Sequence, residues 1–196
     1  MYKLNGVMYS AEEIKSKVKE LAKQIEKDYA GEELLVVGIL KGASVFCADL
    51  IREIDLDVRM DFMVVSSYGS STESSGTVKI IKDLDVDIEN KNVLIVEDII
   101  DSGLTLSSLV AALKTRRPKS LKLCTLLDKP QRRTANIDVD YVGYVIEDKF
   151  IVGYGIDYDE KYRNLPYIGI VEEHNKKEYK NYLMLLFNII KKLYKL

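Results

Sequence analysis

The sequence has 196 residues, of which 47% are hydrophobic and 31% charged, and a chain of this length can bury a full core as one globular domain. The formal net charge of −2 gives no support to a nucleic-acid-binding protein. Two isolated cysteines and a single histidine argue against a disulfide framework and a zinc site, and they favour a reducing compartment. The N-terminus lacks a signal-peptide pattern and no apolar run could span a bilayer, so we expect a cytoplasmic protein without a transmembrane segment.

Apolar runs alternate with helical patterns along the chain, which predicts an α/β fold with helices flanking a mostly parallel sheet. A capping box, Ser10 with Glu13, precedes apolar residues at helical spacing from Ile14 to Ile25 and so predicts the first helix. Further helices are expected at 44–54 and 106–116, and strands at 34–40, 59–67, 78–82, 93–96, 121–127 and 141–145. The Ser/Gly-rich stretch 66–76 offers nothing to pack, which predicts a mobile loop.

The run from Val93 to Leu106 carries the most specific chemistry. Its first four residues are apolar and suit a parallel strand covered on both faces. Glu97 and Asp98 follow at the carboxyl edge, where open α/β sheets bind ligands, and they can accept hydrogen bonds from a vicinal diol or help hold a hard cation. The turn 101–105, Asp-Ser-Gly-Leu-Thr, then directs backbone N–H groups into a helix start that suits a phosphate dianion. The run predicts a sugar-phosphate site.

This run resembles the phosphoribosyl pyrophosphate loop of the type I phosphoribosyltransferases, specifically the 6-oxopurine branch, the hypoxanthine(-guanine) phosphoribosyltransferases. Matching segments follow in the family's order from about Leu34 to Val171. The resemblance implies the type I phosphoribosyltransferase fold for residues 1–171: a central, mostly parallel sheet flanked by helices, with a small hood and a flexible lid loop. It also implies a homodimer or homotetramer, with no nucleic-acid partner.

The activity that the resemblance implies is purine salvage. The enzyme would transfer the 5-phosphoribosyl group from phosphoribosyl pyrophosphate to hypoxanthine, and also to guanine, with Mg²⁺ as cofactor. The product would be the nucleoside monophosphate, and pyrophosphate would leave.

Residue roles for the sugar-phosphate half come with the resemblance. Asp101 is the expected catalytic residue, because it would accept or share the proton of purine nitrogen 7. The expected substrate-binding and metal-binding groups are Ser102, Gly103, Leu104 and Thr105 around the 5′-phosphate, Glu97 and Asp98 on the ribose hydroxyls, and Glu97, Asp98 and Asp157 at the metal. Lys41 and Gly42 resemble the pyrophosphate loop, in which an unusual cis peptide precedes the glycine. Ser67 and Tyr68 resemble the lid that closes over the reaction centre.

The purine half involves three further segments. Lys129 would read the 6-oxo group, because an ammonium has donors but no acceptor for the amino group of adenine. Phe150 would stack on the base and Ile151 would lend backbone contacts. Asp157 would also face the position-2 edge, and Arg163 suits bidentate phosphate contact.

Two other functions stay open. A regulator that keeps this fold as a ligand sensor and binds RNA or DNA would need a basic face, whereas the net charge is slightly negative. A phosphoribosyltransferase for xanthine or adenine is the second alternative: Lys129 argues against adenine, and nothing argues firmly against xanthine. Leu104 stands where some family members have lysine, so one charge near the phosphate is missing.

Residues 172–196 extend beyond the resemblance. They contain no Gly or Pro, and the polar residues Asn181, Asn188, Lys192 and Lys195 fall on one helical stripe, which predicts an amphipathic helix with a broad apolar arc. We expect this helix to pack on the domain or on another subunit. Binding to a membrane surface is the alternative, favoured by the lysines near its end.

Overall fold

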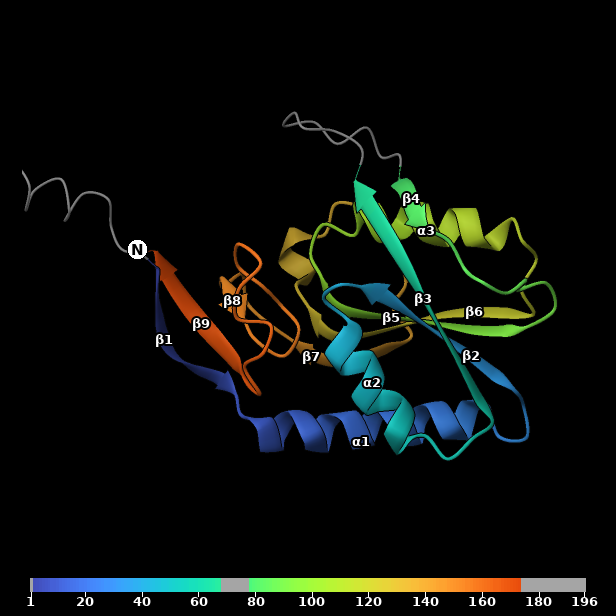
Figure 1. The fold of residues 1–196 in the computed structure, drawn as a ribbon, viewed down its shortest axis with the longest axis horizontal. Coiled ribbons are helices and arrows are strands. Elements are labelled where there is room, and N and C mark those ends of the chain that lie inside the picture. Colours follow the sequence, from blue (N-terminus) through green and yellow to red (C-terminus); the bar gives the residue numbers. More distant parts are fainter. Residues whose placement is uncertain (1, 68–77, 174–196) are drawn as a thin grey trace, which may run out of the picture.

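The computed structural model describes residues 2–67 and 78–173, which form two sheets and three α-helices (Figure 1). In chain order the elements are β1 Tyr2–Tyr9, α1 Ala11–Asp28, β2 Leu34–Leu40, α2 Ser44–Glu53, β3 Val58–Ser67, β4 Val78–Lys82, β5 Asn92–Ile100, α3 Leu104–Lys114, β6 Ser120–Asp128, a 3-10 helix Pro130–Arg132, β7 Tyr141–Val145, β8 Ile151–Val152 and β9 Ile168–Glu173.

The larger sheet has six strands in the order β4-β3-β2-β5-β6-β7. Every neighbouring pair is parallel except β3 and β4. The predicted mostly parallel sheet is therefore confirmed, and its two central strands, β2 and β5, are the most continuously apolar and buried. Because the strands run in one direction, the turns that follow β2, β5 and β6 meet at one edge of the sheet.

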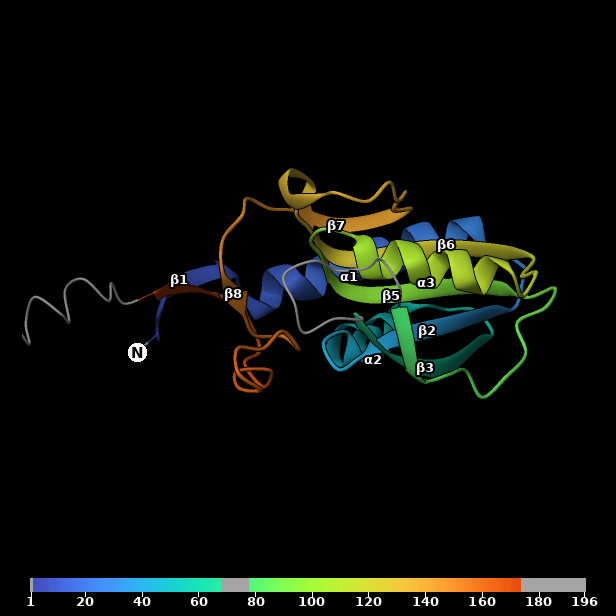
Figure 2. The ribbon, with the colours of Figure 1, turned by 90° about the horizontal axis from the view of Figure 1, so that it is seen from above.

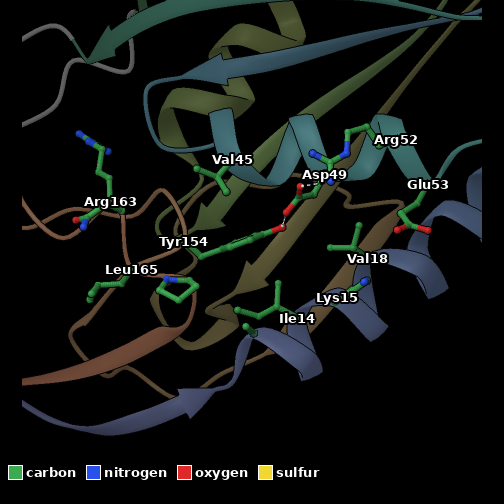
Figure 3. Close-up of a pocket in the computed structure, with 13 residues that line it drawn as sticks. Ile14, Lys15, Val18, Val45, Asp49, Arg52, Glu53, Tyr154, Arg163 and Leu165 are labelled. Carbon is green, nitrogen blue, oxygen red and sulfur yellow. Dashed lines mark hydrogen bonds and ion pairs between the residues drawn. The ribbon is translucent and has the colours of Figure 1, made fainter.

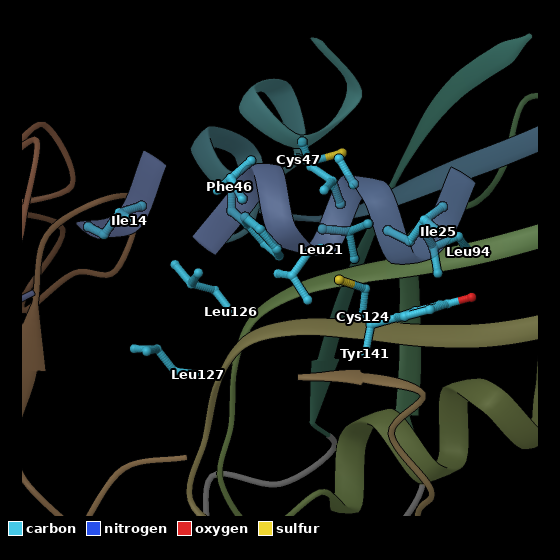
Figure 4. Close-up of a cluster of buried hydrophobic side chains, with 14 of the residues drawn as sticks. Ile14, Leu21, Ile25, Phe46, Cys47, Leu94, Cys124, Leu126, Leu127 and Tyr141 are labelled. Atoms are coloured by element: carbon cyan, nitrogen blue, oxygen red, sulfur yellow. The ribbon is translucent and has the colours of Figure 1, made fainter. Parts of the chain in front are cut away.

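Helices cover both faces of this sheet, with α1 and α2 on one side and α3 on the other (Figures 1 and 2). Alternate residues of β5 serve the two sides: Leu94 joins the α1 and α2 core, whereas Val93 and Ile95 join the α3 core. Figure 4 shows Leu21 of α1 and Phe46 of α2 in the first of these cores. Because neighbouring residues of β5 point to opposite faces, the sheet forms the middle layer between α1 and α2 on one side and α3 on the other.

The first helix forms as its sequence predicts. Ser10 accepts a hydrogen bond from the Glu13 amide, and the Glu13 carboxylate accepts one from the Ser10 amide, which completes the capping box. The predicted apolar stripe, Ile14, Val18, Leu21, Ala22 and Ile25, is buried.

A second, three-stranded antiparallel sheet, in the order β1-β9-β8, lies beyond the carboxyl ends of the parallel strands (Figures 1 and 2). It occupies the place of the small hood that the resemblance implies. The sequence patterns predicted none of its strands, because β8 has only two residues and β1 contains register shifts and Gly6 at φ +103°.

Two predicted boundaries next to the site need correction. The strand expected at 93–96 continues to Ile100, so Glu97 and Asp98 lie within β5 and not in the turn after it. The helix expected at 106–116 begins at Leu104 and ends at Lys114, because Gly103 already forms its N-cap.

Other expectations concern parts of the chain that the structure does not describe. Of the mobile loop predicted at 66–76, residues 68–76 lie outside the described residues, as do residues 174–196 of the terminal helix predicted within 172–196. Within the described ranges, no helix combines the length and apolarity needed to cross a membrane.

Candidate active site

The predicted sugar-phosphate residues come together where β5 leads into α3. A cavity of about 150 Å³ is lined by Glu97, Asp101, Ser102, Gly103 and Thr105, together with Ile99, Ile100 and Leu106. Leu104, which was expected among the phosphate groups, does not line this cavity, although its amide lies 3.4 Å from Ser102 Oγ. The N-terminus of α3 points into this region, and a helix N-terminus favours an anion.

Gly103 is required at the start of α3 for two separate reasons. Its φ of +76° is a left-handed conformation that most L residues avoid. A Cβ added here would also lie 2.9 Å from Cδ of Arg133. The tight turn of the predicted phosphate loop therefore depends on this glycine.

The two neighbouring carboxyl groups of β5 are harder to ionise than free carboxyl groups. Burial raises the pKa of the Glu97 carboxyl well above its usual value, and the charge of Asp98 raises this pKa further. Glu97 Oε2 is buried and has no hydrogen-bond partner among the described residues, although the residue as a whole is only partly buried. Burial also raises the pKa of Asp98 to about 6, while backbone amides and the Arg163 charge act to lower it. Both groups can therefore accept donors or a cation from a ligand.

Three segments are in close contact at the Asp98 carboxylate. A Cβ on Gly42 would lie 2.0 Å from Oδ2 of Asp98, and a Cβ on Gly155 would lie 2.1 Å from the carbonyl oxygen of Gly42. The turn after β2, the strand β5 and the loop after β8 thus meet through two glycines. The cis peptide of this turn joins Leu40 to Lys41, one bond before the bond that leads directly into Gly42.

The charged residues of the predicted pyrophosphate region pair with one another. Lys41 Nζ lies 3.0 Å from Glu160 Oε2, and an Nη of Arg163 lies 2.8 Å from Asp157 Oδ1. Arg163 also donates to the Gly155 carbonyl at 2.8 Å, while its buried Nε has no hydrogen-bond partner in residues 2–67 and 78–173. Glu160 Oε2 also lies 3.5 Å from an Nη of Arg163, so Lys41, Asp157 and Arg163, which come from two separate segments of the predicted site, belong to one group of ion pairs.

The predicted purine-binding residues follow β6 and flank β8. Lys129 is only 5% exposed, and its Nζ donates to the Lys149 carbonyl at 2.8 Å. Phe150 is 47% exposed, and its ring meets Tyr158 edge-on at 5.3 Å between centroids. Ile151 is buried in β8 opposite Ile170 of β9. Of the two predicted lid residues, Ser67 is the last residue of β3, and Tyr68 lies outside the described residues.

Sequence reasoning missed the basic residues that support Asp101. Arg132 Nε lies 3.5 Å from Asp101 Oδ1, and Arg133 Nε donates to the Asp101 carbonyl at 3.2 Å. Arg133 also pairs with Asp128 at the end of β6. The only signal in the sequence was the cluster of cations after this strand, which by itself fits a solvated turn.

A larger cavity of about 390 Å³ lies between α1, α2 and residues 154–166 (Figure 3). Figure 3 shows Tyr154 reaching toward α2, where its hydroxyl donates to Asp49 Oδ2 at 2.7 Å. Arg163 is the only predicted site residue among its lining residues. This cavity is therefore distinct from the predicted sugar-phosphate site.

Comparisons with known proteins agree with the geometry. A family model described as phosphoribosyl transferase domain matches residues 8–159. The chain is 56% identical over 169 residues to hypoxanthine-guanine phosphoribosyltransferase of Bacillus subtilis (strain 168), covering 86% of this chain and 94% of that one. It is 51% identical over 175 residues to the enzyme of the same name from Mycobacterium avium, covering 86% of each. It also matches 26% of the length of the bifunctional protein TilS/HprT of Listeria monocytogenes, at 55% identity.

Solved structures are similar over most of the chain. A hypoxanthine-guanine phosphoribosyltransferase from Bacillus anthracis, with a HEPES molecule in its active site, superposes with a TM-score of 0.83 at 54% identity, covering 88% of this chain and all (100%) of that one. A hypoxanthine phosphoribosyltransferase from Staphylococcus aureus has a TM-score of 0.84 at 54% identity, covering 86% and 92%.

Proposed function

Because the chain belongs to the phosphoribosyl transferase family, in its hypoxanthine-guanine phosphoribosyltransferase branch, we propose that the site at the carboxyl edge transfers a 5-phosphoribosyl group from phosphoribosyl pyrophosphate to nitrogen 9 of hypoxanthine and of guanine. The products are the nucleoside monophosphate and pyrophosphate. One observation carries the proposal: Glu97, Asp101 and the hydroxyl-bearing turn that starts α3 line one cavity, next to the buried Lys129.

The 5′-phosphate is held by the turn that starts α3. Ser102, Gly103, Leu104 and Thr105 supply backbone N–H groups and two hydroxyls at the positive end of the helix dipole. Since Leu104 carries no charge, binding of the phosphate relies on these neutral donors and on the helix dipole.

Mg²⁺ fits the donor set around the ribose and the leaving group. Glu97, Asp98 and Asp157 offer hard oxygen ligands, and the unpartnered Glu97 Oε2 with the raised Asp98 pKa supports a place for positive charge. Within the described residues, no three such side chains gather into a metal site. In the proposal, one or two of these carboxylates hold Mg²⁺ together with oxygens of the substrate. When bound, Mg²⁺ would offset negative charge on the departing pyrophosphate.

The pyrophosphate is stabilised by Lys41, Gly42 and Arg163. In the structure, Lys41 is paired with Glu160, and Arg163 is paired with Asp157. Both cations therefore already lie where the turn after β2 meets the loop after β8, the proposed pyrophosphate site. Binding of a multiply charged anion there would weaken these pairs and draw both cations toward it. Gly42 keeps the turn close to Asp98, because no side chain fits between them.

The purine lies on the far side of the ribose. Asp101 accepts the proton of nitrogen 7 as nitrogen 9 attacks the anomeric carbon, and Lys129 donates to the 6-oxo group. The exposed ring of Phe150 stacks on the base, with the backbone of Ile151 and the Asp157 carboxylate at its position-2 edge.

Ser67 and Tyr68 belong to the proposed lid, which would keep water from the electron-deficient ribose. The proposed assembly is a homodimer or homotetramer.

A steady-state assay tests this function. Hypoxanthine, guanine, xanthine and adenine are each supplied with phosphoribosyl pyrophosphate and Mg²⁺, and nucleotide formation is measured. We expect turnover with hypoxanthine and guanine and none with adenine. Turnover with xanthine alone would replace the proposed substrate, and no turnover with any base would favour the ligand-sensing regulator.

Asp101→Asn tests the assigned chemistry in the same assay. An amide keeps the shape of the side chain but cannot accept the proton, so we expect kcat to fall by about 100- to 10,000-fold. Asp55→Asn serves as the control, since this residue is exposed in the turn between α2 and β3, at the opposite edge of the sheet. Near-normal turnover of Asp101→Asn would show that its assigned role is wrong.

A further inference from the structure

Asp101 stands at one end of a chain of ion pairs. Arg132 Nε lies 3.5 Å from Asp101 Oδ1, and an Nη of the same guanidinium lies 3.4 Å from Asp148 Oδ1. Asp148 Oδ1 lies 3.4 Å from Lys129 Nζ as well. One arginine thus links the group assigned to proton acceptance with the group assigned to the 6-oxo edge.

The two oxygens of Asp101 differ in their surroundings. Oδ1, which faces Arg132, is buried and has no hydrogen-bond partner within the described chain. The side chain as a whole is 47% exposed, so its accessible surface lies on the remaining atoms, including Oδ2. A carboxylate held through one oxygen presents the other in a defined direction.

The surrounding backbone supports this arrangement. Arg132 ends the 3-10 helix that Pro130 begins, so its position relative to Lys129 is set by a single short turn. The amides of Thr134 and Ala135 both donate to the Ser102 carbonyl at 3.0 Å. The segment that carries Arg132 is therefore tied directly to the turn that carries Asp101.

We propose that Arg132 is a positioning residue for the reaction: it holds Oδ1 of Asp101 so that Oδ2 faces the purine, and through Asp148 it couples this carboxylate to Lys129. This inference rests on the proposed function. It requires arginine, since a planar guanidinium can contact two carboxylates through separate nitrogens, whereas the single ammonium of lysine offers no such fork.

The test compares Arg132→Gln with Arg132→Lys. We expect Arg132→Gln to lower kcat by about 5- to 100-fold. A fivefold loss corresponds to the upper end of the range for an exposed ion pair, and a 100-fold loss to a misplaced catalytic group. The KM for phosphoribosyl pyrophosphate should stay unchanged, and Arg132→Lys should recover part of the loss. Arg59→Gln is the matched control, because Arg59 is similarly exposed and pairs with Glu33 at the opposite edge of the sheet.

A double-mutant cycle separates positioning from general support of the fold. In the Asp101→Asn background, Arg132→Gln should have no further effect on kcat, since an amide has no charge to hold. Equal fold losses in both backgrounds, or a parallel rise in both KM values, would overturn the proposal. If Asp101→Asn itself left kcat unchanged, the proposed function would fail and not the contact with Arg132. If Arg132→Gln does not fold, Arg132→Lys replaces it in the double-mutant cycle. A wild-type kcat for Arg132→Lys would then overturn the proposal.

Discussion

At the scale of single residues, Lys129 combines deep burial with a remaining capacity to donate. Its Nζ donates to the Lys149 carbonyl and lies near one carboxylate oxygen of Asp148, which leaves a third donor for a ligand. These contacts keep the ammonium at the end of β6, where Asp148 and Arg132 link it to Asp101. The residue is therefore suited to selecting among purines more than to binding the sugar.

Lys129→Ala should accordingly affect the base more than the sugar. An unpaired buried acceptor costs about 1 to 3 kcal/mol, so we expect the KM for hypoxanthine to rise by about 5- to 150-fold with little change for phosphoribosyl pyrophosphate. Steady-state titration of each substrate measures the two effects. Lys119→Ala, which removes an exposed lysine paired with Glu32, should change neither KM. Equal losses for both substrates would point to a folding defect instead.

At the scale of elements, α1 owes its start to a local motif and its stability to burial. The capping box satisfies amides at its N-terminus, while one face of the helix packs into the core shared with α2. The cap is exposed, and neither Ser10 nor Glu13 lines the sugar-phosphate cavity. Removing it should thus affect stability and leave the chemistry alone.

We expect Ser10→Ala to lower the melting temperature by about 2 to 4 °C without changing kcat. Calorimetry and the steady-state assay measure the two quantities. Ser16→Ala is the matched control, since Ser16 is exposed within the same helix, where alanine is a better helix former. An equal fall in melting temperature for both variants would contradict the capping role.

At the scale of the whole molecule, the second sheet joins the two ends of the described chain. β1 pairs with β9 from Tyr2 opposite Glu173 to Tyr9 opposite Ile168. A truncation that tests the terminal segment must therefore follow Glu173, because an earlier cut would shorten β9.

Truncation after Glu173 should alter the sedimentation mass or sharply lower solubility while nucleotide formation by the site is retained. The predicted amphipathic helix has too broad an apolar arc to stand free in water, so it must pack on protein or on a lipid surface. Sedimentation of the full chain and of the truncated chain is the measurement. An unchanged, equally stable and soluble oligomer would exclude packing, and flotation of only the full chain with liposomes would favour the membrane alternative.

Sequence patterns by themselves determined the features that depend on near neighbours. The two-residue and 3.6-residue periods predicted the strands of the larger sheet and the helices on its faces, since each pattern reports which side of its own element is buried. The turn chemistry from Asp101 to Thr105 predicted an anion site, because glycine, hydroxyls and a helix start act within a few residues of one another.

Only the tertiary structure decided features that join distant segments. The pairing of β1 with β9 depends on backbone hydrogen bonds between residues 159 to 171 positions apart, and no local period reports them. The approach of Gly42 to Asp98 and of Arg132 to Asp101 likewise follows from how the ends of β2, β5 and β6 meet at one edge. Residue types determined which chemistry was available, whereas burial and distance, which arise only when the sheet assembles, decided which groups act together.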